Sequence, residues 1–378
     1  MIPPRTASPA STRPAWSEVD LGAVAANYRE VRRRLRPGVR IIASTKANAY
    51  GHGAVEVARA LAAEGADWLA TGSFDEAVAV REAGVETPML LFACALPDAM
   101  GDAVRAGFVP TVHDLDSARA VSAAARGSAS VWIKVDAGLG RLGVPLEEAD
   151  AFARAVAELS NVLVEGLYTH LPFVDAAGRR WAAERLSAFQ ALAESLVRAG
   201  LPLTFTQALS SAGLLAGLED DSSAVCPGHV LYGLPPASAE IADMSPFRPA
   251  LRAVKTRLIH VSTHREARRA GIGGGIRLPA GAATGVVPFG RTDGYRAPRG
   301  GRQAFMLVRG QRVPVRGVSL EHTTLDLTGV EAAVGNEVVV LGEQGDEAIT
   351  ATEIADWQGA HVDDVVLAFD RHTTPFYI

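Results

Sequence analysis

The chain has 378 residues, of which 48% are hydrophobic and 21% charged, and its formal net charge at pH 7 is −5. This length and apolar content are enough for two domains that each have a core. The small negative charge gives no broad basic field, so we expect no nucleic-acid partner. No apolar run approaches the roughly 18 residues of a membrane helix, so we expect no membrane association.

The cysteines and the first residues of the chain indicate its compartment. Only Cys94 and Cys226 occur, which argues against a disulfide framework and is typical of a reducing environment. Residues 1–15 are rich in Pro, Ser and Arg and lack the apolar segment of a signal peptide. We therefore predict a disordered leader over residues 1–15 and a cytoplasmic location.

Residues 16–240 alternate short apolar runs with Ala-rich stretches of helix length. The runs are Ile41–Thr45, Trp68–Thr71, Met89–Ala93, Val109–His113, Val131–Asp136, Val164–His170, Phe205–Leu209 and Ala224–Cys226. Eight strand–helix units in succession predict an α/β fold, a (β/α)8 barrel of the TIM type. Such barrels build their active sites where the strands end, and polar residues stand there at Lys46, Asp136, His170 and Ser210.

The pattern changes after Pro235-Pro236. Residues 241–378 contain short runs with frequent glycine and period-two alternation, and few helical stretches beyond Ala351–Trp357. This composition predicts a second, mainly antiparallel β domain over residues 241–378.

Lys46 directly follows the apolar run Ile41-Ile42-Ala43 and opens the run Lys46-Ala47-Asn48-Ala49-Tyr50-Gly51-His52-Gly53. An amine held in an apolar pocket at a strand end loses proton affinity and becomes a nucleophile toward carbonyl groups. The run resembles the pyridoxal-phosphate lysine motif of the alanine racemase family, whose members are fold-type III enzymes. The resemblance implies the cofactor pyridoxal 5′-phosphate, with Lys46 as its Schiff-base lysine and Tyr50 adding a hydroxyl at the phosphate.

The segment Ile133–Gly143 is similar to the family's K-x-D-T-G-x-x-R-x-G segment. The resemblance implies that Arg141 holds the phenolic oxygen of the cofactor, and that a carbamylated Lys134 positions Arg141. A guanidinium offers a rigid donor fork that an ammonium does not reproduce. The same residues also spell G-x-G-x-x-G, a dinucleotide-binding pattern, but Val144-Pro145 follows where a helix should begin.

Two further segments resemble the family in order along the chain. Tyr168-Thr169-His170 is similar to its T-H-F strand end, whose histidine lies beside the pyridine ring. The alternative for His170 is a satisfied core histidine. Ser210-Ser211-Ala212 stands where the family has Asn-Ser-Ala, which implies that Ser211 binds the phosphate.

Cys226–Gly233 stands where the family has R-x-G-x-x-x-Y-G. The resemblance implies that Gly228 and His229 give backbone N–H groups to the phosphate, and loops after the last two strands of such a barrel commonly do so. Cys226 replaces the arginine that pairs with the pyridine nitrogen. A neutral thiol leaves that nitrogen freer to protonate, and the alternative is that Cys226 is a small apolar filler.

The chain departs from the family at its second base, a tyrosine that comes from the partner subunit. The aligned residue is Ile272, and no tyrosine occurs between Tyr232 and Tyr295. An isoleucine cannot transfer a proton. If a second base exists, Glu321 and His322 of a partner subunit are the first candidates.

The resemblance therefore implies a pyridoxal-phosphate amino-acid racemase or epimerase that acts on a small amino acid as a head-to-tail homodimer. Because the tyrosine base is missing, we expect weak or no alanine racemase activity. A decarboxylase or lyase on the same scaffold remains an alternative, since it needs protonation from one face only. A cofactor-binding homologue without turnover is the other alternative. We expect no metal site.

Overall fold

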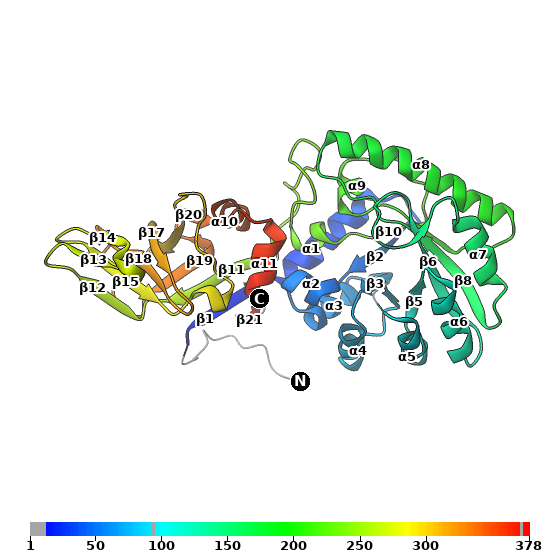
Figure 1. Cartoon of the computed structure of the whole chain (residues 1–378), viewed down its shortest axis with the longest axis horizontal. Helices are drawn as coiled ribbons and strands as arrows, with labels where there is room; N and C mark the ends of the chain where they lie inside the picture. The colour runs from blue at the N-terminus through cyan, green and yellow to red at the C-terminus, as the bar shows by residue number, and fades with distance from the viewer. Residues whose placement is uncertain (1–12, 93–94, 371–372) are drawn as a thin grey trace. The chain divides into compact units, whose positions relative to one another are not determined.

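The computed structural model describes residues 13–92, 95–370 and 373–378, and the side chain of Ile272 is not described. The chain divides into two compact units (Figure 1). The barrel unit comprises Gly22–Tyr50 and Ala54–Arg248, and the β unit comprises the segment up to Leu21, Gly51–Gly53 and Pro249–Ile378. No helix in the described part of the chain is long and apolar enough to cross a membrane.

Within the described residues, eight parallel strands close into a barrel. They are β2 Arg40–Ser44, β3 Trp68–Thr71, β4 Met89–Leu91, β5 Val109–Val112, β6 Ala129–Asp136, β8 Val162–Tyr168, β9 Phe205–Gln207 and β10 Ala224–Val225. The barrel closes because β2 pairs with β3 on one side and with β10 on the other. These strands are mainly apolar because both faces of the sheet are covered. The predicted (β/α)8 barrel is confirmed.

Helices follow most of the strands and surround the barrel (Figure 1). They are α1 Leu21–Arg34, α3 Ala54–Ala63, α4 Phe74–Glu82, α5 Met100–Arg105, α6 Leu115–Ala124, α7 Ala149–Ala157, α8 Ala176–Arg198 and α9 Ser211–Leu215. Several begin at a residue whose side chain accepts a backbone hydrogen bond, as Asp114 does for α6 and Asp175 for α8. Such caps satisfy N–H groups that the first turn of a helix leaves unpaired.

Aromatic side chains fill the interior of the barrel. The rings of Trp132 and Phe205 stack with centroids 5.0 Å apart, and Trp68 meets Phe205 edge-on at 5.3 Å. Gly166 makes room for this cluster, because a Cβ there would lie 2.3 Å from the indole of Trp132. The interior is therefore a packed core, and chemistry is left to the strand ends and the loops that follow them.

The β unit is built on a mainly antiparallel sheet, as predicted. Its strands are β1 Ala15–Val19, β11 Leu251–Arg257, β12 His260–Thr263, β15 Ala283–Val287, β16 Phe305–Val308, β17 Gln311–Val318, β18 Thr323–Asp326, β19 Glu337–Gln344, β20 Glu347–Ile349 and β21 Thr374–Tyr377, with a separate hairpin of β13 Arg268–Ala270 and β14 Ile276–Leu278. Only the pair of β1 and β21 is parallel among the described pairings of this sheet. Two helices complete the unit, α10 Ala351–Gln358 and α11 Val362–Asp370, of which the sequence predicts the first alone.

The N-terminal strand corrects the predicted domain boundaries. Residues 1–12 of the expected leader, and also Cys94, lie outside the described residues. Ala15, however, already belongs to β1, which pairs antiparallel with β11. Residues 15–21 therefore lie in the β unit rather than in the leader or the barrel, and the second boundary falls after Arg248. A short strand does not reveal in its own sequence which distant strand it will pair with.

Candidate active site

Lys46 follows β2 and begins the short segment α2 Lys46–Gly51, which contains a left-handed helical turn. Ala47, Asn48, Ala49 and Tyr50 have φ values of 54°, 52°, 54° and 54°, in the left-handed region. This conformation costs about 1–2 kcal/mol for each ordinary residue, so the surroundings must hold it. The Lys46 side chain is exposed, which corrects the predicted apolar pocket around it, and its Nζ lies 5.5 Å from the centroid of the Tyr50 ring.

Hydrogen bonds fasten this turn at three points. The N–H of Ala49 donates to the carbonyl of Thr45 at 2.8 Å, and Asn48 Oδ1 accepts from the N–H of Ala54 at 2.8 Å. The N–H of Asn48 donates to Glu76 Oε1 at 2.8 Å. Glu76, from the first turn of α4, is a site residue that the sequence analysis did not identify. Its Ser-x-x-Glu spacing from Ser73 indicates only a helix cap.

Tyr50, Ser211 and Gly228 meet beside this turn. Ser211 is buried, and its Oγ accepts from the N–H groups of Gly228 at 3.0 Å and Val230 at 3.4 Å. A Cβ on Gly228 would lie 2.3 Å from the hydroxyl oxygen of Tyr50. The Tyr50 ring also packs against His229, with centroids 5.3 Å apart. These contacts form a cradle of hydroxyl and backbone N–H groups that any side chain on residue 228 would fill.

Tyr232 connects the cradle to the strand that leads to Lys46. Its hydroxyl donates to the carbonyl of Ser44 in β2 at 2.8 Å, and its ring lies 4.9 Å from that of Tyr50. Burial raises the pKa of this phenol, so it stays protonated and able to donate. The sequence motif contained Tyr232, but nothing in its spacing predicted the bond to Ser44.

Three cationic side chains influence His170. Lys134 is buried in β6, with its Nζ 4.6 Å from the centroid of the Tyr168 ring. Burial, and then the charge of Arg141, lowers the pKa of Lys134 to about 7. The pKa of His170 is lowered to about 3, mainly by burial and to a smaller extent by the charges of Lys134, Lys46 and Arg141. His170 is therefore neutral at neutral pH and stands in a strongly positive environment.

Asp136 shapes the loop that carries Arg141. Its Oδ1 accepts from the N–H groups of Gly138 at 2.9 Å and Gly140 at 3.1 Å, and its Oδ2 accepts from the N–H of Arg141 at 3.2 Å. Burial alone would raise the pKa of Asp136, but these bonds outweigh it and lower the pKa. The Arg141 side chain is exposed. Strand β7 Val144–Pro145 follows this loop where a dinucleotide site would have a helix, so the dinucleotide interpretation is wrong.

Cys226 follows β10 and packs partly buried against the aromatic core of the barrel. Burial raises the pKa of its thiol to about 12, although the charges of Lys46 and Lys134 act in the opposite direction. The thiol is therefore neutral at any physiological pH and offers neither a cation nor an anion to a ligand.

The remaining predicted residues belong to the β unit. Glu321 and His322 are both exposed, in the loop between β17 and β18. Ile272 begins the short turn η3 Ile272–Gly274, and its side chain is not among those described. The structure therefore brings Lys46, Tyr50, Lys134, Arg141, His170, Ser211, Cys226, Gly228 and His229 together in the barrel unit. It supplies no geometry that joins Glu321, His322 or Ile272 to them.

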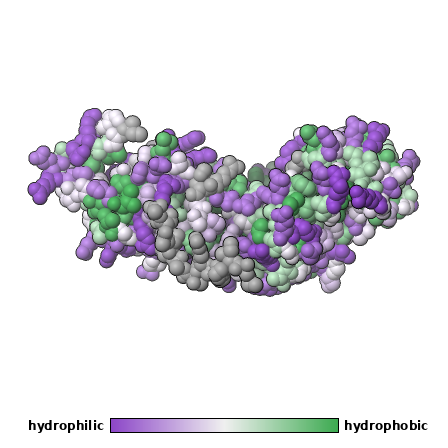
Figure 2. All heavy atoms as spheres, turned by 90° about the horizontal axis from the view of Figure 1, so that it is seen from below, coloured by the Kyte–Doolittle hydropathy of each residue, from purple (hydrophilic) through white to green (hydrophobic). Residues whose placement is uncertain are grey.

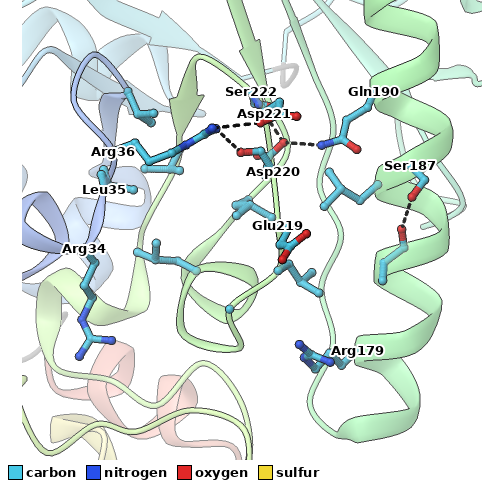
Figure 3. Close-up of a pocket in the computed structure, with 18 residues that line it drawn as sticks. Arg34, Leu35, Arg36, Arg179, Ser187, Gln190, Glu219, Asp220, Asp221 and Ser222 are labelled. Atoms are coloured by element: carbon cyan, nitrogen blue, oxygen red, sulfur yellow. Dashed lines mark hydrogen bonds and ion pairs between the residues drawn. The ribbon is translucent and has the colours of Figure 1, made fainter.

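A separate cavity of about 850 Å³ lies in the barrel unit between the end of α1 and helices α8 and α9 (Figure 3). Val39, which lines it, precedes β2, whereas Lys46 follows β2, so the cavity is not part of the site described above. Some of its polar side chains bond to each other, as Arg36 does to Asp221 at 3.0 Å and Gln190 to Asp220 at 3.2 Å (Figure 3). The described residues contain no group of three or more His, Cys, Asp or Glu side chains that could hold a metal ion.

Comparison with known proteins covers both units. The family model "Alanine racemase, N-terminal domain" matches residues 19–236, and "Alanine racemase, C-terminal domain" matches residues 251–377. An alanine racemase of Syntrophobacter fumaroxidans is 35% identical over 363 residues, which cover 95% of this chain and 96% of the relative. An alanine racemase of Symbiobacterium thermophilum is 35% identical over 374 residues and covers 97% of each chain.

Solved structures agree with these matches. The alanine racemase of Bacillus anthracis with bound L-Ala-P is 28% identical, with a TM-score of 0.87, and the match covers 98% of this chain and 96% of that chain. The alanine racemase from E. faecalis is also 28% identical, with a TM-score of 0.89 and coverage of 98% and 99%. Since both family models match and the likeness extends over nearly its whole length, the chain belongs to the alanine racemase family, whose members are pyridoxal-phosphate enzymes.

Proposed function

We propose that the chain is a pyridoxal-phosphate amino-acid racemase or epimerase with weak or no activity toward alanine. The observation that carries this proposal is the gathering of an exposed amine, Lys46, with a cationic cluster and the Gly228 cradle in the barrel unit. Relatives that match nearly its whole length are named alanine racemases, which supports racemase chemistry. No comparison supports the decarboxylase or lyase alternative.

The residues present fit pyridoxal phosphate. The charges of Lys46 and Arg141 act on His170 in this site, and such cations favour a ligand with anionic groups. The cradle supplies hydroxyl and N–H donors of the kind that hold a phosphate, from Ser211, Tyr50 and the backbone at Gly228 and His229. Arg141 would hold the phenolic oxygen and the Lys46 amine would carry the aldehyde carbon. When bound, the cofactor withdraws electrons from the substrate and so makes the proton on its Cα easier to remove.

Two side chains would tune this site without holding substrate. The pKa of His170 is about 3, so its ring is neutral at neutral pH. The ring could therefore pack beside the pyridine ring without adding a charge. The pKa of about 7 for Lys134 leaves a large fraction of its amine unprotonated at neutral pH. Only an unprotonated amine combines with carbon dioxide, and the resulting anion would relieve the repulsion between Lys134 and Arg141. These features support the proposed carbamate on Lys134.

Racemisation needs proton transfer on both faces of Cα. The amine of Lys46 would serve one face, because the same amine would hold the cofactor and so would lie close to the substrate. For the other face we propose Glu321 or His322 of a partner subunit, since Ile272 has no group that can transfer a proton. The loop that carries both residues is well fastened, because Leu320 O accepts from the N–H of Thr292 at 2.8 Å and from its hydroxyl at 2.9 Å.

A head-to-tail homodimer is part of this proposal. Large apolar side chains are exposed on the β unit, among them Leu320 at 67%, Val334 at 63% and Ile259 at 42%. Figure 2 shows apolar residues gathered in patches between hydrophilic ones on one face of the molecule. Leu320 directly precedes the candidate bases, so a second chain that covered it would also lie close to Glu321 and His322. This exposure supports the proposed dimer.

The test is incubation of the cofactor-loaded protein with a panel of L- and D-amino acids in D2O, followed by chiral and mass analysis. Racemisation predicts deuterium at Cα with inversion for one or more substrates, and Lys46→Ala should abolish it. Release of carbon dioxide would support the decarboxylase alternative. Deuterium exchange with retention would show a single working base. A cofactor-loaded protein that left every amino acid unchanged would contradict an enzymatic function.

A further inference from the structure

The carboxylate of Glu76 does not make the bond that its sequence position favours. Ser73 caps α4, and its Oγ accepts from the N–H of Glu76 at 3.3 Å. In a capping box the glutamate side chain would accept the N–H of Ser73 in return. Here that N–H donates to Thr71 Oγ1 at 3.3 Å. Both carboxylate oxygens of Glu76 point elsewhere, Oε2 to the Thr71 hydroxyl at 2.5 Å and Oε1 to the N–H of Asn48 at 2.8 Å.

The partner in this second bond is the left-handed turn. Asn48 stands two residues after Lys46 and two before Tyr50, in the middle of the strained run. Its N–H is held from outside the turn by a residue 28 positions away, which is itself fixed on a capped helix. A left-handed run of ordinary residues persists only where the surroundings hold it. Loss of the Glu76 carboxylate would therefore let the backbone relax and displace the groups on either side of Asn48.

We infer that Glu76 is a positioning residue for cofactor binding. Its carboxylate holds the left-handed turn, and the turn directs the Lys46 amine and sets the Tyr50 hydroxyl against Gly228. Glu76 acts through Asn48 and has no contact with the reacting atoms. The inference rests on the proposed cofactor site at Lys46.

The experiment compares Glu76→Ala with Asp75→Ala. Asp75 is the other acidic residue in the first turn of α4 and is exposed, so its removal is a matched control. The readouts are the affinity of the apoprotein for pyridoxal phosphate, from the visible absorption of the bound cofactor, and the melting temperature of the apoprotein. We expect Glu76→Ala to weaken cofactor affinity about 10-fold, which corresponds to the loss of about one hydrogen bond. Asp75→Ala should leave the affinity unchanged.

Two conservative variants separate the effect of side-chain length at residue 76 from the effect of its charge. They also replace Glu76→Ala in the experiment if that variant does not fold. Glu76→Gln keeps an acceptor for Asn48 and can donate to Thr71, so it should bind the cofactor almost as the wild type does. Glu76→Asp keeps the charge but is one methylene shorter, so it should bind more weakly. The opposite order would overturn the inference, because charge rather than the bond to Asn48 would then matter.

A second substitution tests the strain directly. Ala47 is exposed and has a φ of 54°, a conformation that glycine adopts without cost. Ala47→Gly should therefore recover part of the affinity lost in Glu76→Ala or Glu76→Asp. If the Glu76 variants lost only thermal stability, or if Ala47→Gly recovered nothing, Glu76 would be an ordinary structural residue and the inference would be wrong. A wild-type apoprotein that bound no cofactor would instead remove the proposed function, and the inference with it.

Discussion

The hydroxyl oxygen of Tyr50 lies directly over Gly228, at a position where a Cβ on residue 228 would be only 2.3 Å away. No ordinary Cβ contact is that short, so an alanine at residue 228 would push the tyrosine ring out of place. Tyr50 also packs against His229 and Tyr232, and it follows Lys46 on the same turn. This close approach couples the lysine turn to the loop after β10.

Gly228→Ala should therefore weaken binding of pyridoxal phosphate, because the displaced Tyr50 hydroxyl no longer completes the cradle. The measurement is the cofactor affinity of the apoprotein by absorption titration. Gly127→Ala is the matched control, since Gly127 lies on the same unit with nothing within 4 Å of the added Cβ. Equal affinity in both variants would show that the cradle does not hold the cofactor.

Ile272→Tyr should raise the rate of alanine racemisation, because it adds a phenol at the position where we propose that the second base is lacking. A positioned acid or base typically contributes about 10²–10⁴-fold. The rate is measured by chiral analysis of D- and L-alanine, with Ile272→Phe as the control that adds the ring without the hydroxyl. Wild-type racemisation of alanine at full rate, or no gain in the tyrosine variant, would contradict the assignment.

Cys226→Arg should slow exchange of the substrate's Cα proton. The thiol is neutral, with a pKa of about 12, whereas an arginine would put a permanent positive charge beside Lys46 and Lys134. That charge would hold the pyridine nitrogen unprotonated and make the cofactor a weaker electron acceptor. Cys226→Ser, which stays neutral, is the control. If both variants exchanged the proton at the wild-type rate, Cys226 would be only a packing residue.

His170 should make the apoprotein less stable as the pH falls below about 6.5. The folded protein has a His170 pKa of about 3, so between pH 6.5 and 3 the unfolded chain binds a proton that the folded chain does not. Stability from this group is complete above the unfolded pKa and declines toward pH 3. The measurement is the free energy of unfolding by denaturant at several pH values. His170→Gln should flatten the dependence, and His260→Gln, at an exposed site, should not.

Tyr295→Phe should leave the protein as stable as the wild type or more stable. Tyr295 is fully buried, and its hydroxyl has no hydrogen-bond partner among the described residues. An unsatisfied buried hydroxyl costs about 1–3 kcal/mol, and phenylalanine removes it while the ring stays. Tyr232→Phe is the contrasting control, because it loses the bond to Ser44 O and should lower stability. Thermal unfolding of the apoprotein compares them, and a marked loss in Tyr295→Phe would reveal a partner for its hydroxyl.

Much of the architecture follows from local pattern. The apolar runs and helix-length stretches specify the strands and helices of the barrel one after another, and period-two alternation does the same for the β unit. The candidate site residues can also be proposed from the sequence, because they stand in short motifs with characteristic spacing. They include Lys46, Arg141, His170, Ser211 and Gly228. Parallel strands in a closed barrel end at one rim, so these motifs converge once the barrel exists.

Relations between distant segments could not be predicted in this way. The Ser73–Glu76 spacing favours a helix cap, yet the Glu76 carboxylate bonds to Asn48 and Thr71 instead. Residues 15–19 read as leader and barrel, yet they pair with β11. The pKa values near 7 for Lys134 and 3 for His170 arise from burial and from cations on other strands and loops. The elements and the chemistry of each motif can be inferred from short stretches of residues, because both depend on neighbours within a few positions. The carboxylate that holds the left-handed turn and the charges that meet in the site cannot be inferred in this way, because hydrogen bonds and electrostatic interactions between remote residues depend on distances that exist only after the barrel has closed.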